Sequence, residues 1–391
     1  MAEAAFSLDE AEAWATRHAA PFDAAAHSAA APPLFASAAF AKSDPQSGTA
    51  TETRLSPSRA YSLALAPQII HSRSELVSQL VSSRAFRQLE FLAVGAFHVF
   101  DPASCTLARV PSTREDVFAT TSIPARSKRA LIKFLKFVLE HDTEPNLSAW
   151  LPHSDVELAA FLAGPEAGFR LDQDLRAYIV SMTLTTDGRV SVADGLRVLH
   201  THLTSMGMFG PGFAAVYPKW GGSSEIAQMA CRAGAVGGAV YMLGTGVRDF
   251  KSAGAESGVQ VTLADGLDLQ TKLLVRSSER VETAPDALPP PAARLTVVVD
   301  DPLPSLFEAV VEGSPTPAVA IVAFPQHTLA DDDGNKFPFP IYALAHSSET
   351  GECPAGQSES PRRCPLTASM MSLLFNSLST LSEHYMSTTL L

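Results

Sequence analysis

One stretch of the chain, Tyr217–Leu243, concentrates the residues best suited to binding another molecule. Within it, Glu225, Gln228 and Arg232 recur at positions i, i+3 and i+7, which places them on one face of a predicted helix. A run of small residues, Ala233–Val240, then ends in Tyr241–Leu243. Arginine and tyrosine are enriched in binding hot spots. Because the stretch holds no nucleophile, metal cage or phosphate loop, it predicts docking to a partner rather than catalysis.

Motifs for common catalytic chemistry are missing from the rest of the sequence. There is no G-x-G-x-x-G fingerprint, no G-x-S-x-G elbow, no H-E-x-x-H pair and no Walker lysine. The nearest candidate, residues 244–249, follows a predicted helix instead of a strand and lacks the third glycine. His200 and His202 are two residues apart on a predicted helix, so they point in different directions and do not share a metal ion. We therefore expect neither a cofactor nor a metal.

Composition excludes several classes of protein. The 391 residues are 46% hydrophobic and 18% charged, which is ordinary for a globular protein of roughly two domains. The net charge of −12 argues against a nucleic-acid partner. The four cysteines match no zinc pattern and no disulfide framework. The N-terminus lacks the basic and apolar regions of a signal peptide, and the apolar run Ala233–Leu243 is too short to span a bilayer. A cytoplasmic protein with peripheral membrane contact only is expected.

Hydrophobic periodicity predicts a helical block within a body that contains strands. Between residues 112 and 206 nearly all segments have helical patterns, and beyond Gly254 the pattern changes to alternation typical of strands. The predicted helices are Ser74–Leu92, Ser127–Glu140, Asp155–Leu162, Asp172–Leu184, Val192–Met206 and Met370–Met386. The predicted strands are Tyr61–Ala66, Val94–Phe100, Leu107–Val110, Val259–Leu263, Thr271–Val275, Leu295–Val299, Ala318–Phe324 and Tyr385–Leu391.

The order of these segments indicates a mixed α/β fold with a discontinuous large domain. We expect residues 1–110 and 207–391 to form the large domain and residues 111–206 to form an inserted all-helical second domain. Residues 42–58 have almost no apolar side chains and are predicted to be a disordered insert.

Several separated motifs resemble the family of Rab escort proteins (Rab geranylgeranyltransferase component A) and Rab GDP-dissociation inhibitors. The family pattern YP-x-x-G-x-x-E-x-x-Q-x-x-x-R, followed by GG-x-YML, is met by Tyr217, Pro218, Gly221, Glu225, Gln228, Arg232 and Tyr241–Leu243. One extra residue stands between Gly221 and Glu225, and Ala239 replaces the second glycine. Residues 69–86, 110–118 and 133–138 resemble further family blocks in the same order, and 114–118 favours the escort branch.

The resemblance implies a large domain similar to the FAD/NAD(P)-binding monooxygenase-like fold. In the family this domain begins with a Gly-rich strand-turn-helix, which this chain lacks. The resemblance also implies a Rab-binding platform formed by Glu225, Gln228, Arg232, Val240, Tyr241 and Met242. A lipid groove is expected between the helices, with candidate lining residues Phe134, Val138, Ile179, Met182, Leu196 and Leu199.

By resemblance, the expected function is that of a Rab escort protein without catalytic activity. It would bind GDP-bound Rab GTPases, present them to the catalytic heterodimer of Rab geranylgeranyltransferase, and carry the geranylgeranyl lipid on Rab to membranes. It would be cytoplasmic, with transient membrane association. Two alternatives stay open: a Rab GDP-dissociation inhibitor without escort activity, and a flavin-dependent oxidoreductase on the same fold.

Overall fold

The computed structural model describes residues 5–20, 37–40, 56–111, 124–164, 168–252, 258–275, 292–298, 302–309, 312–330, 334–354 and 385–390. By contacts the chain divides into two compact units. Unit 1 comprises Met1–Ala11, Lys42–Ala227 and Pro290–Leu391, and unit 2 comprises Glu12–Ala41 and Gln228–Pro289. Two of the four boundaries fall within helices, α1 (Leu8–Arg17) and α9 (Ser223–Val236).

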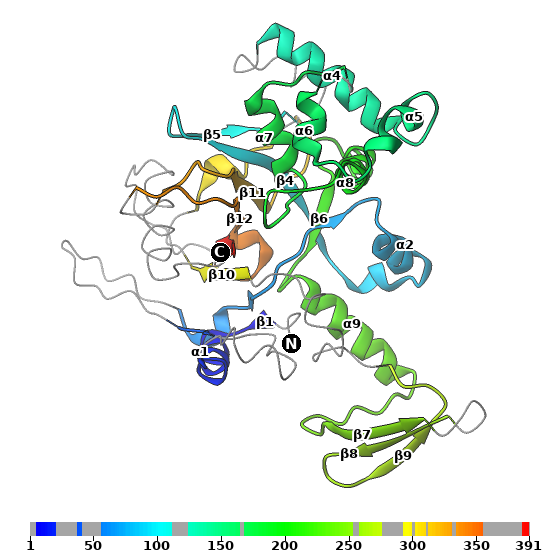
Figure 1. The fold of residues 1–391 in the computed structure, drawn as a ribbon. Helices are drawn as coiled ribbons and strands as arrows, with labels where there is room; N and C mark the ends of the chain where they lie inside the picture. The colour runs from blue at the N-terminus through cyan, green and yellow to red at the C-terminus, as the bar shows by residue number, and fades with distance from the viewer. Residues whose placement is uncertain are drawn as a thin grey trace, which may run out of the picture. The chain divides into compact units, whose positions relative to one another are not determined.

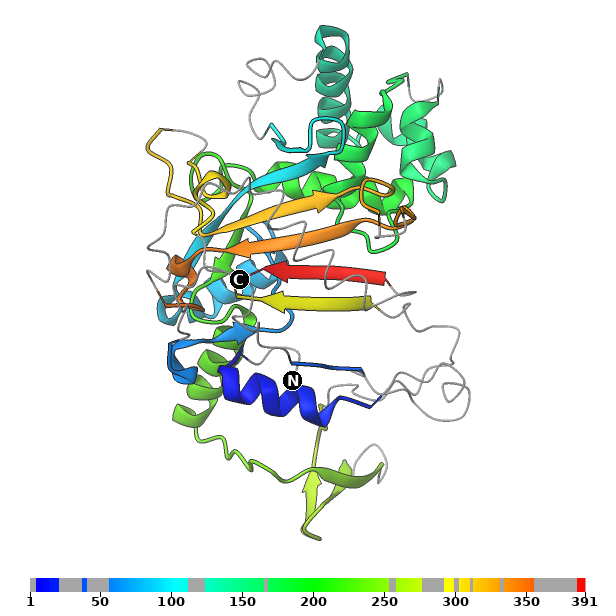
Figure 2. The same ribbon diagram turned by 90° about the vertical axis from the view of Figure 1, so that its left-hand side faces the viewer.

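Unit 1 is built on a mixed eight-stranded sheet. The strand order is β10-β13-β12-β11-β4-β6-β3, and β5 pairs with β4 off this path. Figure 2 shows β4, β11, β12, β13 and β10 side by side in that order. The strands span Ile70–His71 (β3), Phe91–Asp101 (β4), Thr106–Arg109 (β5), Ala215–Pro218 (β6), Ala292–Val297 (β10), Val319–Phe324 (β11), Ile341–His346 (β12) and Tyr385–Leu390 (β13). A separate antiparallel pair joins β1 (Ala5–Phe6) to β2 (Leu63–Ala64).

Strand β11 lies inside the sheet and is buried along its whole length. Its sequence, VAIVAF, is a continuous apolar run, as expected for a strand covered on both faces. Alternate residues enter different cores: Val322 and Phe324 pack with Ile341, whereas Val319 and Ile321 pack with Tyr217. The sheet thus separates two apolar layers.

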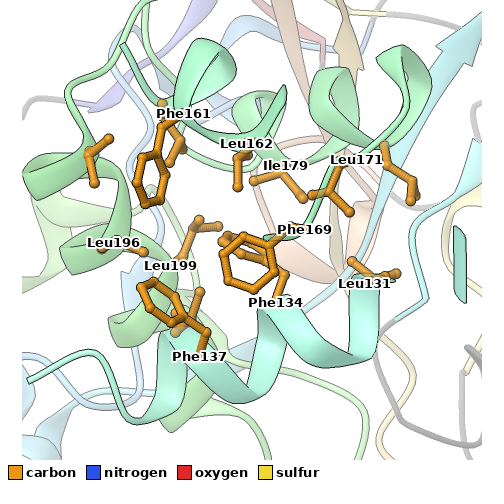
Figure 3. Packing of buried hydrophobic residues seen from close by; sticks show 14 residues of the cluster. Leu131, Phe134, Phe137, Phe161, Leu162, Phe169, Leu171, Ile179, Leu196 and Leu199 are labelled. Atoms are coloured by element: carbon orange, nitrogen blue, oxygen red, sulfur yellow. The ribbon is translucent and has the colours of Figure 1, made fainter. Parts of the chain in front are cut away.

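A group of helices packs at one end of the sheet, beside β4 and β6 (Figure 1). Along the chain these helices are α4 (Ala125–Leu139), α5 (Asn146–Trp150), α6 (Leu158–Ala163), α7 (Gln173–Ser181) and α8 (Val192–Ser205). Two starts are fixed by side-chain caps, because Asp172 accepts from the Leu175 amide and Ser191 accepts from the Asp194 amide. The apolar stripes of these helices meet in one buried cluster, shown in Figure 3. The amphipathic helices predicted at 127–140, 172–184 and 192–206 are confirmed within a few residues.

The helix predicted over Ser74–Leu92 is shorter in the structure. Helix α2 spans Glu75–Ser82, and after a 3₁₀ turn (η3, Ala85–Gln88) the chain enters β4 at Phe91. The Ser83 hydroxyl donates to the Gln79 carbonyl, and Arg84 then adopts a left-handed conformation with φ 60°. Such side-chain bonds to the preceding turn compete with helix continuation. The periodic leucines therefore overstated the helix length.

Unit 2 contains a three-stranded antiparallel meander, β7 (Val247–Ser252), β8 (Val259–Leu263) and β9 (Asp268–Thr271). The strand predicted over Thr271–Val275 is wrong, because β9 ends where that prediction begins. A tight turn containing Gly266, with φ 92°, sets the β8–β9 register and pairs Thr262 with Asp268. Leu273 and Val275 lie beyond the strand and are exposed.

Mixed α/β architecture is confirmed, as are strands overlapping Tyr61–Ala66, Leu107–Val110, Leu295–Val299 and Tyr385–Leu391. Tyr385 and Met386 belong to β13 rather than to a helix, and the rest of the helix predicted from Met370 lies outside the described residues. Most of the insert predicted at 42–58 also lies outside them, with Ser58 already in a 3₁₀ turn (η2, Ser58–Ala60).

The division at residues 110 and 206 stays a prediction. Two further 3₁₀ turns, η6 (Pro304–Leu306) and η7 (Ser348–Thr350), connect strands.

Candidate docking segment and apolar cavity

Most of the turn that precedes α9 is tightly packed, although the Trp220 side chain is 52% exposed. Tyr217, in β6, is fully buried, and its hydroxyl lies against Gly222 so closely that a side chain on Gly222 would collide with it. Gly222 also has φ 62°, which favours glycine. The neighbouring Gly221 packs against Ala5 with no room for a Cβ. The expectation that all of Tyr217–Leu243 is a docking surface is therefore wrong at its beginning, which is a packed turn.

A buried carboxylate, which the sequence did not single out, holds this turn. The Tyr217 hydroxyl donates to Glu352 Oε1 at 2.7 Å, and the Thr350 hydroxyl lies 3.2 Å from Glu352 Oε2. His346 Nδ1 makes a short contact with the same Oε2. Glu352 and Thr350 are fully buried and His346 nearly so. Burial beside the carboxylate raises the pKa of the Tyr217 hydroxyl far above its usual range, so it stays protonated and donates.

Glu225 occupies the first turn of α9. Its amide donates to the Gly222 carbonyl at 3.1 Å, so the helix starts directly on the packed turn. The side chain is half-buried, and this burial raises the pKa of its carboxyl. A carboxylate near a helix N-terminus is favoured by the helix dipole, which opposes the effect of burial.

The rest of α9 and the segment after it belong to unit 2 and are mostly exposed, with Met229 as a buried residue on the helix. Gln228 and Arg232 are both exposed on the helix. Gly238, with φ 93°, ends the helix: its amide bonds to the Ala235 carbonyl, and the Ala239 amide bonds to the Gly234 carbonyl at 2.9 Å. This is the Schellman arrangement, which reverses the chain direction after a helix.

The reversed segment presents four consecutive apolar side chains to solvent. Val240, Tyr241, Met242 and Leu243 are 85%, 48%, 47% and 91% exposed. The Tyr241 hydroxyl nevertheless has a fixed position, because it donates to the Cys231 carbonyl at 2.9 Å. It lies over Gly234, where any side chain would collide with it. Tyr241 is thus held against α9 while Val240 and Met242 extend into solvent.

A separate apolar cavity of about 510 Å³ lies inside unit 1. One wall is formed by sheet residues, among them Val94, Phe97 and Ala215, and the opposite wall by α4, α7 and α8. The six residues predicted to line a lipid groove divide into two groups. Phe134, Ile179, Met182 and Leu199 line the cavity. Val138 and Leu196 are fully buried in the helical cluster and do not (Figure 3 labels Leu196).

The sheet wall and the one histidine of the cavity were not predicted. His202, on α8, is packed edge-on against Phe97 at 5.4 Å and His71 at 5.6 Å between ring centroids. Burial lowers its pKa to about 4, so the imidazole is neutral at pH 7. Lys136, on α4, is a charged residue among the otherwise mostly apolar lining. The lining suits an apolar ligand rather than an anion.

In the part of the chain that the structure describes, no cluster of three or more histidine, cysteine or acidic side chains is arranged to hold a metal ion. Among the same residues, no helix is both long enough and apolar enough to cross a membrane.

Comparisons with known proteins show the family of this chain. The family model described as GDP dissociation inhibitor matches residues 34–285, which is more than half of the chain. Rab proteins geranylgeranyltransferase component A of Saccharomyces cerevisiae is 30% identical over 304 residues, covering 76% of this chain and 47% of the relative. Rab escort protein 1 of Arabidopsis thaliana is 28% identical over 236 residues, covering 56% and 41%.

The fold is shared with a solved structure of Rab GDI from Plasmodium falciparum. The TM-score is 0.53 at 17% identity, with 85% of this chain and 74% of that chain covered. The chain spans about half the length of the curated yeast relatives it matches, 47% and 46%. On the extent of the family match, this chain belongs to the GDP dissociation inhibitor family.

Proposed function

We propose that this chain is an escort for Rab GTPases. It binds them in the GDP-bound form, presents their C-terminal cysteines to the catalytic heterodimer of Rab geranylgeranyltransferase, and shields the attached lipid on the way to a membrane. The chain makes or breaks no covalent bond itself. It acts in the cytoplasm and touches membranes transiently. Relatives named as component A of this transferase support the escort role.

The exposed segment Val240–Leu243 is the observation that carries the proposal. Monomeric proteins rarely leave several consecutive large apolar side chains in solvent unless they meet a partner. Here the backbone around them is ordered by the helix cap at Gly238 and by the bond from Tyr241. A preorganised apolar segment loses little conformational entropy on binding. It therefore suits a protein partner.

Glu225, Gln228 and Arg232 complete the proposed platform together with Val240, Tyr241 and Met242. The exposed guanidinium of Arg232 provides several donors for carboxylates or carbonyls on a partner. Discrimination between GDP and GTP forms requires contact with switch segments of the GTPase, because these reorder around the γ-phosphate. The platform is proposed to meet those segments.

The apolar cavity is the proposed place for the geranylgeranyl chain. Its volume of about 510 Å³ lies within the usual range of small-molecule sites, roughly 300–1,000 Å³. Each buried methylene contributes about 0.8 kcal/mol to binding. Three helices contribute the predicted lining residues: α4 supplies Phe134, α7 and its C-terminal end supply Ile179 and Met182, and α8 supplies Leu199. Neutral His202 adds no charge to this wall, and Lys136 on α4 is a charged residue among its lining.

A reconstituted prenylation assay tests the escort role directly. Purified chain, Rab, transferase heterodimer and geranylgeranyl diphosphate are combined, and lipid incorporation into Rab is measured with the chain present or omitted. The proposal predicts incorporation that depends on the chain. Extraction of prenylated Rab from membranes without any support of prenylation would contradict it and would indicate an inhibitor instead.

The cavity is tested by a substitution that fills it. Met182→Trp is expected to lower the affinity for a fluorescent geranylgeranyl-cysteine analogue on the order of tenfold, because the ring takes the space of the chain. Leu151→Trp is the matched control, since Leu151 is exposed on the helical part of unit 1. Equal affinity of both variants and the parent chain would place the lipid elsewhere.

A further inference from the structure

The turn from Tyr217 to Gly222 is held in place by residues 350–352, which are distant in sequence. Besides the bond from the Tyr217 hydroxyl to Glu352, the Trp220 amide donates to the Thr350 carbonyl at 2.7 Å. The Trp220 ring lies over Gly351, where a side chain would collide with it. Both the side chains and the backbone of residues 350–352 therefore hold the turn.

A third segment of the chain, at Ser62, bonds to both the turn and residue 352. The Ser62 amide donates to the Glu352 carbonyl at 3.0 Å, and the Ser62 hydroxyl donates to the Trp220 carbonyl at 2.8 Å. Ser62 thus connects Glu352 and the turn through its own backbone and side chain. All of these groups belong to unit 1.

We infer that Glu352 is a positioning residue for Glu225, acting through Tyr217. This inference rests on the proposed function, because Glu225 is taken as part of the partner-binding platform. Glu352 touches no partner: it is fully buried. Its carboxylate fixes the Tyr217 hydroxyl, the hydroxyl packs against Gly222, and the Gly222 carbonyl accepts the Glu225 amide.

A buried carboxylate at this place is better explained by positioning than by stability alone. Well-packed apolar side chains of similar volume generally fill a buried site as stably as an ionised group with its partners. Unlike apolar side chains, the carboxylate imposes direction, because its acceptor atoms fix where each donor lies. Tyr217 and His346 approach different oxygens of the same carboxylate, so the hydroxyl of Tyr217 has one defined position.

A double-mutant cycle on partner dissociation separates positioning from general destabilisation. Tyr217→Phe removes one hydroxyl and keeps the packed ring. We expect it to speed dissociation of GDP-bound Rab on the order of tenfold, measured by stopped-flow fluorescence with the full chain. In a Glu225→Ala background the same change is expected to have no further effect, because the residue being positioned is gone. Additive effects in the cycle would overturn the inference.

Amide hydrogen exchange provides a second readout that needs no partner. In Tyr217→Phe the amides of Trp220, Gly222 and Glu225 are expected to exchange at least several-fold faster, while amides of β11 keep their rates. Tyr342→Phe is the matched control, because Tyr342 is a buried tyrosine on β12 that packs with Val99 and Ala323 away from the turn. Unchanged exchange at the three amides would overturn the inference.

The two arms also separate this inference from the proposed function. If the parent chain fails to bind GDP-bound Rab, the proposed function fails and the claim that Glu225 is positioned for Rab fails with it. Faster exchange in Tyr217→Phe but not in Tyr342→Phe would still show that the carboxylate positions the first turn of α9. If the parent binds and the cycle is additive, the proposed function stands and the positioning role of Glu352 is wrong.

Discussion

Residues 217–222 and residues 237–243 precede and follow the same helix in the sequence, yet the tyrosine in each segment meets a different environment. Before α9, an aromatic side chain is buried and its one polar atom is bonded to a buried carboxylate. After α9, apolar side chains are exposed and an aromatic hydroxyl is bonded to a backbone carbonyl. Tyr217 and Tyr241 thus have different tasks. The first fixes the helix in its unit, and the second fixes a segment for a partner.

The contrast between Tyr217 and Tyr241 indicates that the segment Tyr217–Leu243 contains a structural part and a proposed partner-binding part. Substitutions at the buried contacts before α9 should change the free energy of unfolding and should affect partner binding only through the position of Glu225. Side-chain substitutions at Val240–Leu243 should change affinity for a partner with little effect on unfolding. Each of the following substitutions tests this separation.

The largest effect is expected at the buried carboxylate. Glu352→Ala leaves Tyr217 and His346 buried without their acceptor, and loss of one partner of a buried pair costs about 3–5 kcal/mol. Urea unfolding should show this loss. Glu349→Ala, an exposed acid on the neighbouring 3₁₀ turn, should change the free energy of unfolding by less than about 0.5 kcal/mol. Similar values for both variants would remove the structural half of the comparison.

Alanine substitution at two glycines with positive φ distinguishes the cost of backbone strain from the cost of a steric collision. Gly244→Ala, at φ 73° with no neighbour near the added Cβ, should cost about 1–2 kcal/mol from backbone strain alone. Gly222→Ala, at φ 62°, also collides with the Tyr217 hydroxyl and should cost about 1–3 kcal/mol more. Thermal unfolding of the two variants measures the difference. Equal losses would show that the hydroxyl does not pack against the turn as described.

A moderate effect on binding is expected in the exposed segment. Met242→Ser should weaken binding of GDP-bound Rab by about 1–3 kcal/mol if the side chain enters a partner pocket. Because Met242 is half exposed, the free energy of unfolding should change by less than about 0.5 kcal/mol. Titration calorimetry and urea unfolding of one preparation provide both values. A loss of stability as large as the loss of affinity would assign Met242 to a core.

The smallest net effect is expected at Gly234. Alanine there favours the helix by about 1 kcal/mol, but its side chain displaces the Tyr241 hydroxyl and the bond to Cys231, worth about 0.5–1.5 kcal/mol. The two effects should nearly cancel in unfolding. In a Tyr241→Phe background the collision disappears, and Gly234→Ala should become stabilising. The same free-energy change in both backgrounds would show that Tyr241 is not held over Gly234.

Periodicity predicted the long amphipathic elements well, because their apolar stripes report a buried face directly. Helices α4 and α8 and the all-apolar β11 were predicted close to their observed bounds. The ends of α2 and the register of β9 depend on local bonds near Ser83 and on the Gly266 turn, which periodicity does not contain. These elements were therefore misplaced.

The site was predictable only where it is local in sequence. Glu225, Gln228 and Arg232 were singled out from their spacing, and Val240, Tyr241 and Met242 from the resemblance to the family; the role of all six at a partner stays a prediction. Glu352 was missed because it bonds to Tyr217 across 135 residues and has no periodic context. The sheet wall of the cavity was missed for a similar reason, since helical periodicity shows which face is buried but not which sheet covers it.

A titration with two nucleotide forms of Rab tests whether this exposed region docks the GTPase. The chain and its Arg232→Ala variant are each titrated with the same unprenylated Rab loaded with GDP or with a nonhydrolysable GTP analogue. We expect tighter binding of the GDP form by the parent chain, and a loss of about 1–3 kcal/mol in that affinity for Arg232→Ala with unfolding unchanged. Absent binding, equal affinity for the two nucleotide forms, or an unaffected variant would contradict the assignment of this exposed region as the Rab-docking surface.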